Sequence, residues 1–328
     1  MKHLPKPILR IAAAVLLSLS GVAAPVAGVP APVLPAKLID AWWIDGSEGL
    51  DISGLSFCAG ELLAVADKVS EHIYRLSPEP GRDSVALAAK ADFARPPLPD
   101  DQPVLLKARA LHYASVPLSM DFEGITCDER GIYLLSERHN RIARLNPEQQ
   151  GAEWLPVRWS EAAKARGFLR HFNGESEGVV RVGEDFWVAL ERDPRGLLKL
   201  SAGDEVGRDF RALPAVSGLD FHGRTEDLAG LAAYGGALYT LERNAFAVCR
   251  RNLDNLQAEW CIHYRDIEEG PTYVYRETRF GKGEGLAVNE QGIFVVLDNN
   301  GVGRAVAPDD SRGLLLHFAF PEMTSEER

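Results

Sequence analysis

A short pattern occurs five times along this chain and limits its fold more than any other feature. In each copy a glycine follows acidic or polar residues and precedes an apolar run, and a second acidic residue comes 12 or 13 positions after the glycine. A repeat longer than about 40 residues that is built from β-strands is typical of blades arranged around an axis. The repeated glycines are Gly54, Gly124, Gly178, Gly230 and Gly285.

Each copy reads as consecutive short strands. The second copy has an apolar run at 125–127, a turn at 128–131, a β-rich run at 132–135 and a third run at 141–145. Such runs, bounded by glycine, asparagine and aspartate, predict antiparallel hairpins. The 328 residues are 46% hydrophobic, which is enough for the core of one large domain. We therefore predict an all-β fold, a β-propeller, over residues 38–320, followed by a tail at 321–328.

The spacing of the copies bears on the number of blades. Consecutive glycines are 70, 54, 52 and 55 residues apart, and the wide first interval holds a proline-rich stretch at 95–100. We interpret it as an insertion within 77–118. The last copy lacks a fourth strand after Phe320, whereas the β-rich run at 38–44 has no blade of its own. Five blades are favoured, closed by pairing this N-terminal strand with the last blade. A sixth blade within 77–118, or two separate domains, are the alternatives.

The first 27 residues read as an export signal. Lys2, Lys6 and Arg10 precede an apolar run at 11–22, which is shorter than a membrane span, and small residues follow. We expect cleavage near residue 27 and a periplasmic or secreted protein; an uncleaved membrane anchor is the alternative. Cleavage removes three cations and no acid, which changes the formal net charge from −11 to −14. An acidic chain of this kind is unsuited to nucleic acid or an anionic membrane, and we expect a monomer with a small-molecule ligand.

Four cysteines, at 58, 127, 249 and 261, would meet an oxidising environment after export. Cys249 and Cys261 flank a turn-like segment at 252–255, so a hairpin would bring them together, and we predict a disulfide between them. Cys58 and Cys127 occupy near-equivalent points of neighbouring copies; pairing and burial as free thiols both remain open. No C-x-x-C spacing occurs, which argues against a cysteine-based zinc site.

Acidic residues recur just before the repeated glycines. The first strand of each propeller blade lines the central channel, so these acids would gather at one mouth. Acids three and one positions before a glycine are two apart, and an extended backbone would point both the same way. Clustered carboxylates suit Ca²⁺, which takes about six to eight oxygen ligands. The candidate metal ligands are Asp121, Glu123, Glu175, Glu177, Asp227 and Glu284, of which Glu123, Glu177 and Glu284 are the candidate catalytic residues.

A second set of acids ends the next strand of each copy and would reach the same mouth if that strand returns antiparallel. Basic residues follow or replace several of these acids, and the guanidinium fork suits phosphate. The alternative is a structural role, in which repeated acids and Glu-Arg pairs hold turns together. The second set is Asp67, Glu137, Glu191, Glu242 and Asp298, and the candidate substrate-binding residues are Arg138, Arg192, Arg243 and Lys282.

Residues 174–178 match G-x-S-x-G, the nucleophile elbow of serine hydrolases. That elbow requires a strand, a turn and then a helix, whereas a strand is predicted after Gly178. Ser176 as a nucleophile, with His139, His171 or His222 as its base, is therefore a minor alternative.

The segments 121–144, 174–200, 225–250 and 282–297 together resemble the bacterial family named for "esterase-like activity of phytase", with its repeated Glu-Gly and Glu-Arg signatures. The resemblance spans most of residues 40–320 and implies an exported propeller that hydrolyses phosphoric or other esters, with inositol phosphates as one substrate class. It carries over no catalytic residue. Calcium-dependent propeller phytases are similar in having an acidic channel mouth, but their six blades and their own motifs do not match this chain.

Two functions follow from these expectations. The first is an exported, metal-assisted phosphoesterase with Ca²⁺ at the acidic mouth and a small phosphorylated or ester substrate. The second is a non-catalytic propeller that binds a ligand or a protein at the same place.

Overall fold

The computed structural model describes residues 30–99, 119–146, 151–171 and 174–323. The expected signal segment at 1–27 and most of the expected tail lie outside the described residues, as does part of the insertion. Within the described residues no helix is long and apolar enough to cross a membrane.

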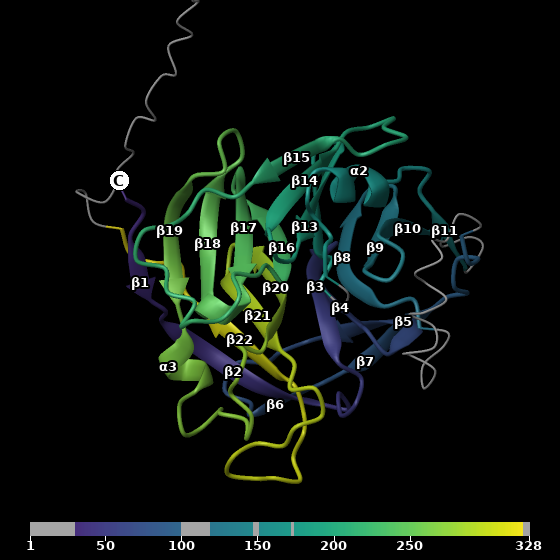
Figure 1. The fold of residues 1–328 in the computed structure, drawn as a ribbon. Helices are drawn as coiled ribbons and strands as arrows, with labels where there is room; N and C mark the ends of the chain where they lie inside the picture. Colours follow the sequence, from purple (N-terminus) through teal and green to yellow (C-terminus); the bar gives the residue numbers. More distant parts are fainter. Residues whose placement is uncertain (1–29, 100–118, 147–150, 172–173, 324–328) are drawn as a thin grey trace, which may run out of the picture. The chain divides into compact units, whose positions relative to one another are not determined.

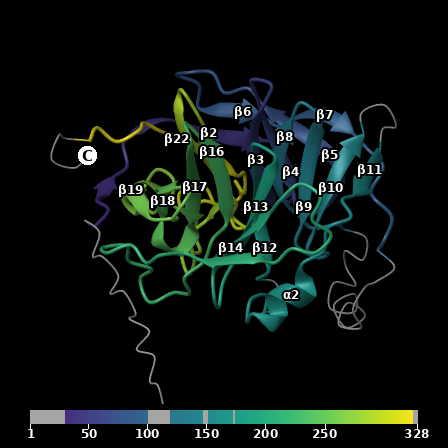
Figure 2. The same cartoon turned by 90° about the horizontal axis from the view of Figure 1, so that it is seen from above.

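The described residues form five sheets of four or five strands each, antiparallel except where β1 and β6 join (Figures 1 and 2). The first is β3 (Ile52–Cys58), β4 (Glu61–Ala66), β5 (Val69–Leu76) and β7 (Ala88–Asp92). The second is β8 (Phe122–Asp128), β9 (Gly131–Ser136), β10 (Arg141–Asn146) and β11 (Gly151–Trp154). The third is β12 (Ser176–Val182), β13 (Asp185–Leu190), β14 (Gly196–Leu200) and β15 (Asp209–Ala212).

The last two sheets each gain strands from the N-terminal region. The fourth is β16 (Gly230–Tyr234), β17 (Ala237–Glu242), β18 (Ala247–Asn252), β19 (Ala258–His263) and β1 (Val33–Pro35). The fifth is β20 (Gly283–Asn289), β21 (Gly292–Leu297), β22 (Leu314–Phe318), β2 (Leu38–Asp45) and β6 (Ser84–Ala86). The short helical turns are α2 (Ser160–Ala165), η1 (Arg243–Ala245) and α3 (Arg265–Glu268).

The five sheets close into a ring. The first strand of each sheet contacts the first strand of the next, and β20 returns to β3. Five apolar clusters fill the spaces between neighbouring sheets. The middle strands β17, β21 and β22 are buried along their whole length because sheets cover both of their faces. The fold is a five-bladed β-propeller, as the repeat predicted.

The repeated glycines let the inner strands approach one another at the axis. A Cβ atom on Gly124 would lie 2.9 Å from the backbone nitrogen of Val179, and one on Gly54 would lie 2.9 Å from the Cα of Gly124. Gly178 stands in the same relation to Gly230 in the next blade. Glycine is therefore required at the closest points of the ring.

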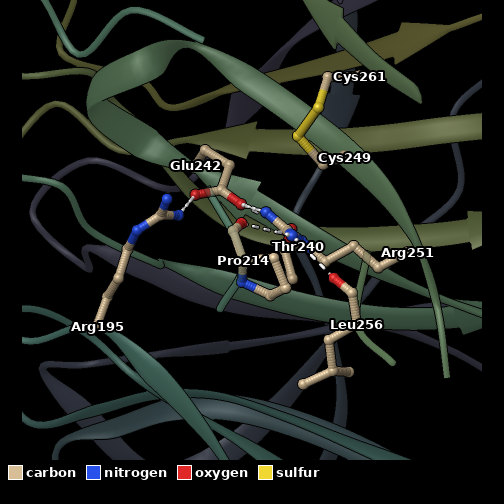
Figure 3. Close-up of a disulfide and its surroundings, with 8 residues drawn as sticks. All are labelled: Arg195, Pro214, Thr240, Glu242, Cys249, Arg251, Leu256 and Cys261. Atoms are coloured by element: carbon tan, nitrogen blue, oxygen red, sulfur yellow. Dashed lines mark hydrogen bonds and ion pairs between the residues drawn. A yellow bond between two sulfur atoms is a disulfide. The ribbon is translucent and has the colours of Figure 1, made fainter. Parts of the chain in front are cut away.

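Ring closure also follows the sequence prediction. β2 pairs antiparallel with β22, so the N-terminal strand completes the last blade, and β6 then pairs parallel with β2. A blade within 77–118 is not formed by the described part of that segment, since β6 joins blade five and β7 joins blade one. Cys58 is bonded to Cys127, which links blades one and two, and Cys249 is bonded to Cys261 within blade four (Figure 3).

Candidate functional site

A repeated backbone hydrogen bond brings the two sets of acids to one mouth. In four blades the N–H of the acid at the end of the second strand donates to the carbonyl of the residue three before the repeated glycine. The two strands are antiparallel, so this bond forms where both reach the same end of the blade. The bonds are Asp67 to Asp51 (2.9 Å), Glu137 to Asp121 (2.9 Å), Glu191 to Glu175 (2.8 Å) and Asp298 to Lys282 (2.8 Å).

A β-bulge directs the residue immediately before the glycine into this mouth. The register of the inner strand shifts by one residue between the position two before the glycine and the glycine itself in blades one, two, three and five. The extra residue in a bulge is unpaired, and its side chain is re-aimed. The four residues at this position, Ser53, Glu123, Glu177 and Glu284, all line one pocket.

This pocket has a volume of about 560 Å³. Beneath it lies a space of about 10 Å³, lined mainly by the repeated glycines and the apolar residues that follow them. A space of this size holds about one water molecule. The mouth is therefore a blind pocket, with members of both acid sets on its walls and an apolar layer as its floor.

Six carboxylates in the pocket form two groups of three. In each group one oxygen from every residue lies within 4.8 Å of the others, so the three could be shared by one cation. The first group comes from blades one and two, and the second from blades two and three. The groups are Asp67, Asp121 and Glu123, and Glu137, Glu177 and Glu191.

Burial and neighbouring like charges act on several of these carboxylates. Burial, followed by the nearby Asp121, raises the pKa of Asp67 to about 8. Desolvation and neighbouring carboxylates raise the pKa of Glu123 and that of Glu177 well above the usual range. Glu191 is only 1% exposed, yet its Oε2 atom has no hydrogen-bond partner among the described residues. The donor set and this unpartnered oxygen fit a divalent cation.

Arg243 compensates part of this negative charge. Its Nε atom donates to Asp227 Oδ2 at 2.8 Å, its Nη1 atom to both carboxylate oxygens of Glu284 at 2.8 Å, and its Nη2 atom to Glu191 Oε1. All three guanidinium nitrogens are thus engaged by acids. Arg243 lines the pocket and serves there as an internal counter-charge; that it contacts substrate stays a prediction. Burial raises the pKa of Glu284 to about 7, although Arg243 acts to lower it.

Two of the expected metal ligands lie outside the pocket lining. Glu175 Oε2 accepts a hydrogen bond from Asn140 Nδ2 at 2.6 Å, and Asp227 accepts bonds from the backbone and side chain of Asn244 at 3.0 Å as well as from Arg243. The expectation that acids two apart point the same way is not met by Glu175 and Glu177, since Glu177, at the bulge, lines the pocket and Glu175 does not. Asp121 does reach the pocket, but from a left-handed backbone with φ of 58°.

Like Arg243, the other three expected substrate-binding residues line the pocket. Arg138 Nη1 donates to the carbonyl of Ser119 at 2.5 Å, and Arg192 Nη1 lies 3.1 Å from Glu191 Oε1. Lys282 Nζ donates to Glu277 Oε2 at 2.8 Å. Each cation is held by an acid or a carbonyl and still faces the cavity. The sequence-based list of metal ligands omitted Asp67, Glu137 and Glu191, although the second acid of the repeat already marked all three.

The equivalent acid of blade four is diverted into the protein interior (Figure 3). Glu242 is fully buried between Arg195 and Arg251, with Oε1 accepting from Arg251 Nη2 at 2.7 Å and from Thr240 Oγ1 at 2.9 Å. Burial acts to raise the pKa of Glu242, but Arg195 and Arg251 hold it below its usual range. Here the structural alternative for the Glu-Arg pairs holds, and blade four contributes Arg243 to the pocket instead of a carboxylate.

The G-x-S-x-G match is a coincidence of sequence. Ser176 is fully buried, donates to Asn140 Oδ1 at 2.7 Å and accepts from Trp159 Nε1 at 3.3 Å. It begins the strand β12, not a helix. The minor alternative of a serine nucleophile is therefore wrong.

No protein-family model matches the chain, and no curated protein matches it in sequence. Among solved structures it is similar to the glutaminyl cyclase of Myxococcus xanthus, at 12% identity over 89% of this chain and 100% of that chain, with a TM-score of 0.49. It is similar to an aldose sugar dehydrogenase of Streptomyces coelicolor, at 14% identity over 88% and 100%, with a TM-score of 0.45. It is also similar to a gluconolactonase of Xanthomonas campestris, at 10% identity over 89% and 99%, with a TM-score of 0.40. At these values the similarities carry no inference about activity.

Proposed function

We propose that the blind pocket binds divalent cations, with Ca²⁺ as the first candidate, and hydrolyses a phosphoric ester. The observation that carries the proposal is the pair of three-carboxylate groups in one cavity, with raised pKa values and cations on the surrounding wall. Hard carboxylate oxygens suit Ca²⁺, and the arginines suit the phosphate that a cation would attract.

Asp67, Asp121 and Glu123 would hold one cation, and Glu137, Glu177 and Glu191 a second. A bound cation supplies a positive charge that polarises the phosphoryl oxygens and lowers the pKa of a bound water. Arg138, Arg192 and Lys282 would contact the remaining phosphoryl oxygens. They line the same cavity, and guanidinium and ammonium groups are the usual protein donors to phosphate.

Glu284 is the candidate general base. Its pKa of about 7 suits proton transfer near neutral pH, and it lines the same cavity as the two carboxylate groups. A water oxygen would form a bond to phosphorus while the bond from phosphorus to the ester oxygen breaks. The proton of the water passes to a carboxylate oxygen of Glu284 and then to the departing alkoxide, which leaves an alcohol and inorganic phosphate.

The test is phosphate release by residues 28–328 from p-nitrophenyl phosphate and from phytate, each with Ca²⁺ and with chelator. We expect release only with Ca²⁺, and a loss of about 10²-fold or more in kcat for Glu177→Gln. Glu175→Gln, the same change two residues away and outside the pocket lining, is the matched control and should retain activity. No release from folded protein under either condition would favour a non-catalytic propeller that binds a ligand or a protein.

The expected location belongs to the same proposal. We propose that residues 1–27 direct export to the periplasm or beyond, where the disulfides Cys58–Cys127 and Cys249–Cys261 would persist.

A further inference from the structure

One wall of the pocket presents an aromatic side chain. The loop between α3 and β20 carries five residues that line the cavity: Glu277, Arg279, Phe280, Gly281 and Lys282. Phe280 is 50% exposed. The five other large hydrophobic residues that are exposed in the described part of the chain are absent from the pocket lining. An exposed ring therefore stands at a cavity whose other walls are largely charged.

The backbone that carries Phe280 is tied down on both sides. The carbonyl of Thr278 accepts a bond from Arg224 Nη2 at 2.6 Å, and the N–H of Gly281 donates to Asn244 Oδ1 at 3.2 Å. The N–H of Lys282 donates to Glu268 Oε1 at 2.9 Å. A Cβ atom on Gly281 would overlap the carbonyl oxygen of Arg243, so this loop packs directly on blade four. A fixed backbone holds the ring at the cavity without an ordering cost on binding.

We propose that Phe280 is a specificity-determining residue, which stacks on the ring of an aryl or heterocyclic phosphoester. The inference rests on the proposed function, in which the phosphate lies among the cations and carboxylates. The organic group of such a substrate would find the exposed face of Phe280 on the cavity wall. The adjacent Arg279 side chain is 81% exposed, and its planar guanidinium can stack on a ring or donate hydrogen bonds to phosphate.

Stacking on Phe280 would favour substrates that join a flat ring to a phosphate. An inositol phosphate carries only hydroxyl and phosphate groups, so it gains nothing from an exposed phenyl ring. A nucleotide or an aryl phosphate joins a flat ring to a phosphate and uses both parts of the cavity. Stacking on an aromatic side chain commonly strengthens binding by about tenfold.

The experiment compares two non-hydrolysable ligands, phenylphosphonate and methylphosphonate, which differ only in the ring. Their dissociation constants are measured by calorimetry in saturating Ca²⁺ for residues 28–328, Phe280→Ala and Phe280→Trp. We expect phenylphosphonate to bind about tenfold more tightly than methylphosphonate. The preference should vanish in Phe280→Ala and persist in Phe280→Trp, while methylphosphonate binds all three proteins equally.

The results separate this inference from the function on which it rests. If both ligands bind equally to the unmutated protein, or if Phe280→Ala keeps the preference, the role of Phe280 is refuted and the phosphoester site stands. If neither ligand binds while Ca²⁺ still does, the phosphoester site itself is refuted, and the inference fails with it. Val306→Ala, at a residue that is 66% exposed and outside the pocket lining, controls for general effects of removing surface hydrophobicity.

Discussion

Glu175 and Glu177 are two residues apart in one copy of the repeat, yet they have different surroundings. Glu177 lines the cavity, where burial and then neighbouring carboxylates raise its pKa, whereas Glu175 accepts a hydrogen bond from Asn140. A residue's place in the repeat therefore does not define its role. The local bulge and the available donors decide whether a carboxylate can reach a cation or serves a turn.

This contrast predicts different effects for the same glutamate-to-glutamine change at the two positions. Glu177→Gln removes a charge from a group of like charges, so the melting temperature in chelator should stay the same or rise. It should also remove the stabilisation by Ca²⁺, which for the unmutated protein is about 2.7 kcal/mol at a concentration 100 times the dissociation constant. Glu175→Gln should keep that response. Thermal melts with and without Ca²⁺ measure both effects, and an unchanged Ca²⁺ response in Glu177→Gln would contradict the assignment.

Among the cations of the site, Arg243 should be the one whose replacement lowers the free energy of unfolding most. Replacing it with glutamine leaves Glu191, Asp227 and Glu284 without their shared partner, and removing one member of a buried ion pair typically costs about 3–5 kcal/mol. Arg279→Gln, at an exposed arginine, should change the unfolding free energy by less than about 0.5 kcal/mol. Urea denaturation of the two variants measures the difference, and similar values would show that Arg243 is not the counter-charge of this wall.

At the scale of the strand, the inner strand of each blade carries the repeated glycine and, in four blades, the bulge before it. Its glycine lets it approach the next inner strand, and in four blades its bulge directs the preceding side chain into the cavity. The packing at the axis and the placing of the candidate ligands thus depend on the same few residues.

The axial glycines should differ in their tolerance of alanine. In Gly124→Ala the new Cβ atom would lie 2.9 Å from the backbone nitrogen of Val179, which cannot move without shifting a blade. Overpacking of this kind costs about 1–3 kcal/mol. In Gly230→Ala the nearest atoms, both from Leu286, lie at 3.2 Å, so a smaller loss is expected. Urea unfolding of both variants checks the order, and an equal loss would mean that the axis adjusts freely.

The blades and their closure could be predicted from the sequence because they depend on period and on apolar pattern. The repeat at Gly54 to Gly285 and the unpaired β-rich run at 38–44 were sufficient for both. The site was predicted only in part. No sequence signal places a bulge before Gly178, and none tells that Glu242 turns inward to Arg195 and Arg251 while Glu191 stays at the cavity. The inward turn of Glu242 depends on arginines that another loop and another strand supply.

At the scale of the whole molecule, the acids of the pocket should link folding to pH. Burial raises the pKa of Asp67 to about 8, and those of Glu284 and Asp298 to about 7, above their usual values of 3.8 for aspartate and 4.5 for glutamate. Between about pH 5 and pH 8 the folded chain therefore holds more protons than the unfolded chain. Rising pH then favours unfolding, so stability in chelator should fall across this range.

Calcium should reverse this trend, because it replaces protons at the carboxylates and binds more tightly as they ionise. Melting temperatures in chelator at pH 5.5 and pH 8, repeated with Ca²⁺, measure the effect. We expect a lower value at pH 8 in chelator and a larger Ca²⁺-induced rise there than at pH 5.5. Stability in chelator that is constant across the range would show that the pocket carboxylates are compensated by other groups.

The central claim is that the acidic mouth is a cation site formed by two carboxylate groups. A calorimetric titration of metal-free residues 28–328 with Ca²⁺ at pH 7.5 tests it most directly, with Glu123→Gln, Glu177→Gln and Glu175→Gln titrated in parallel. We predict two bound Ca²⁺ per chain, the loss of one in Glu123→Gln and in Glu177→Gln, and unchanged binding in Glu175→Gln. Absence of Ca²⁺ binding by folded protein, or equal binding by all three variants, would contradict the account.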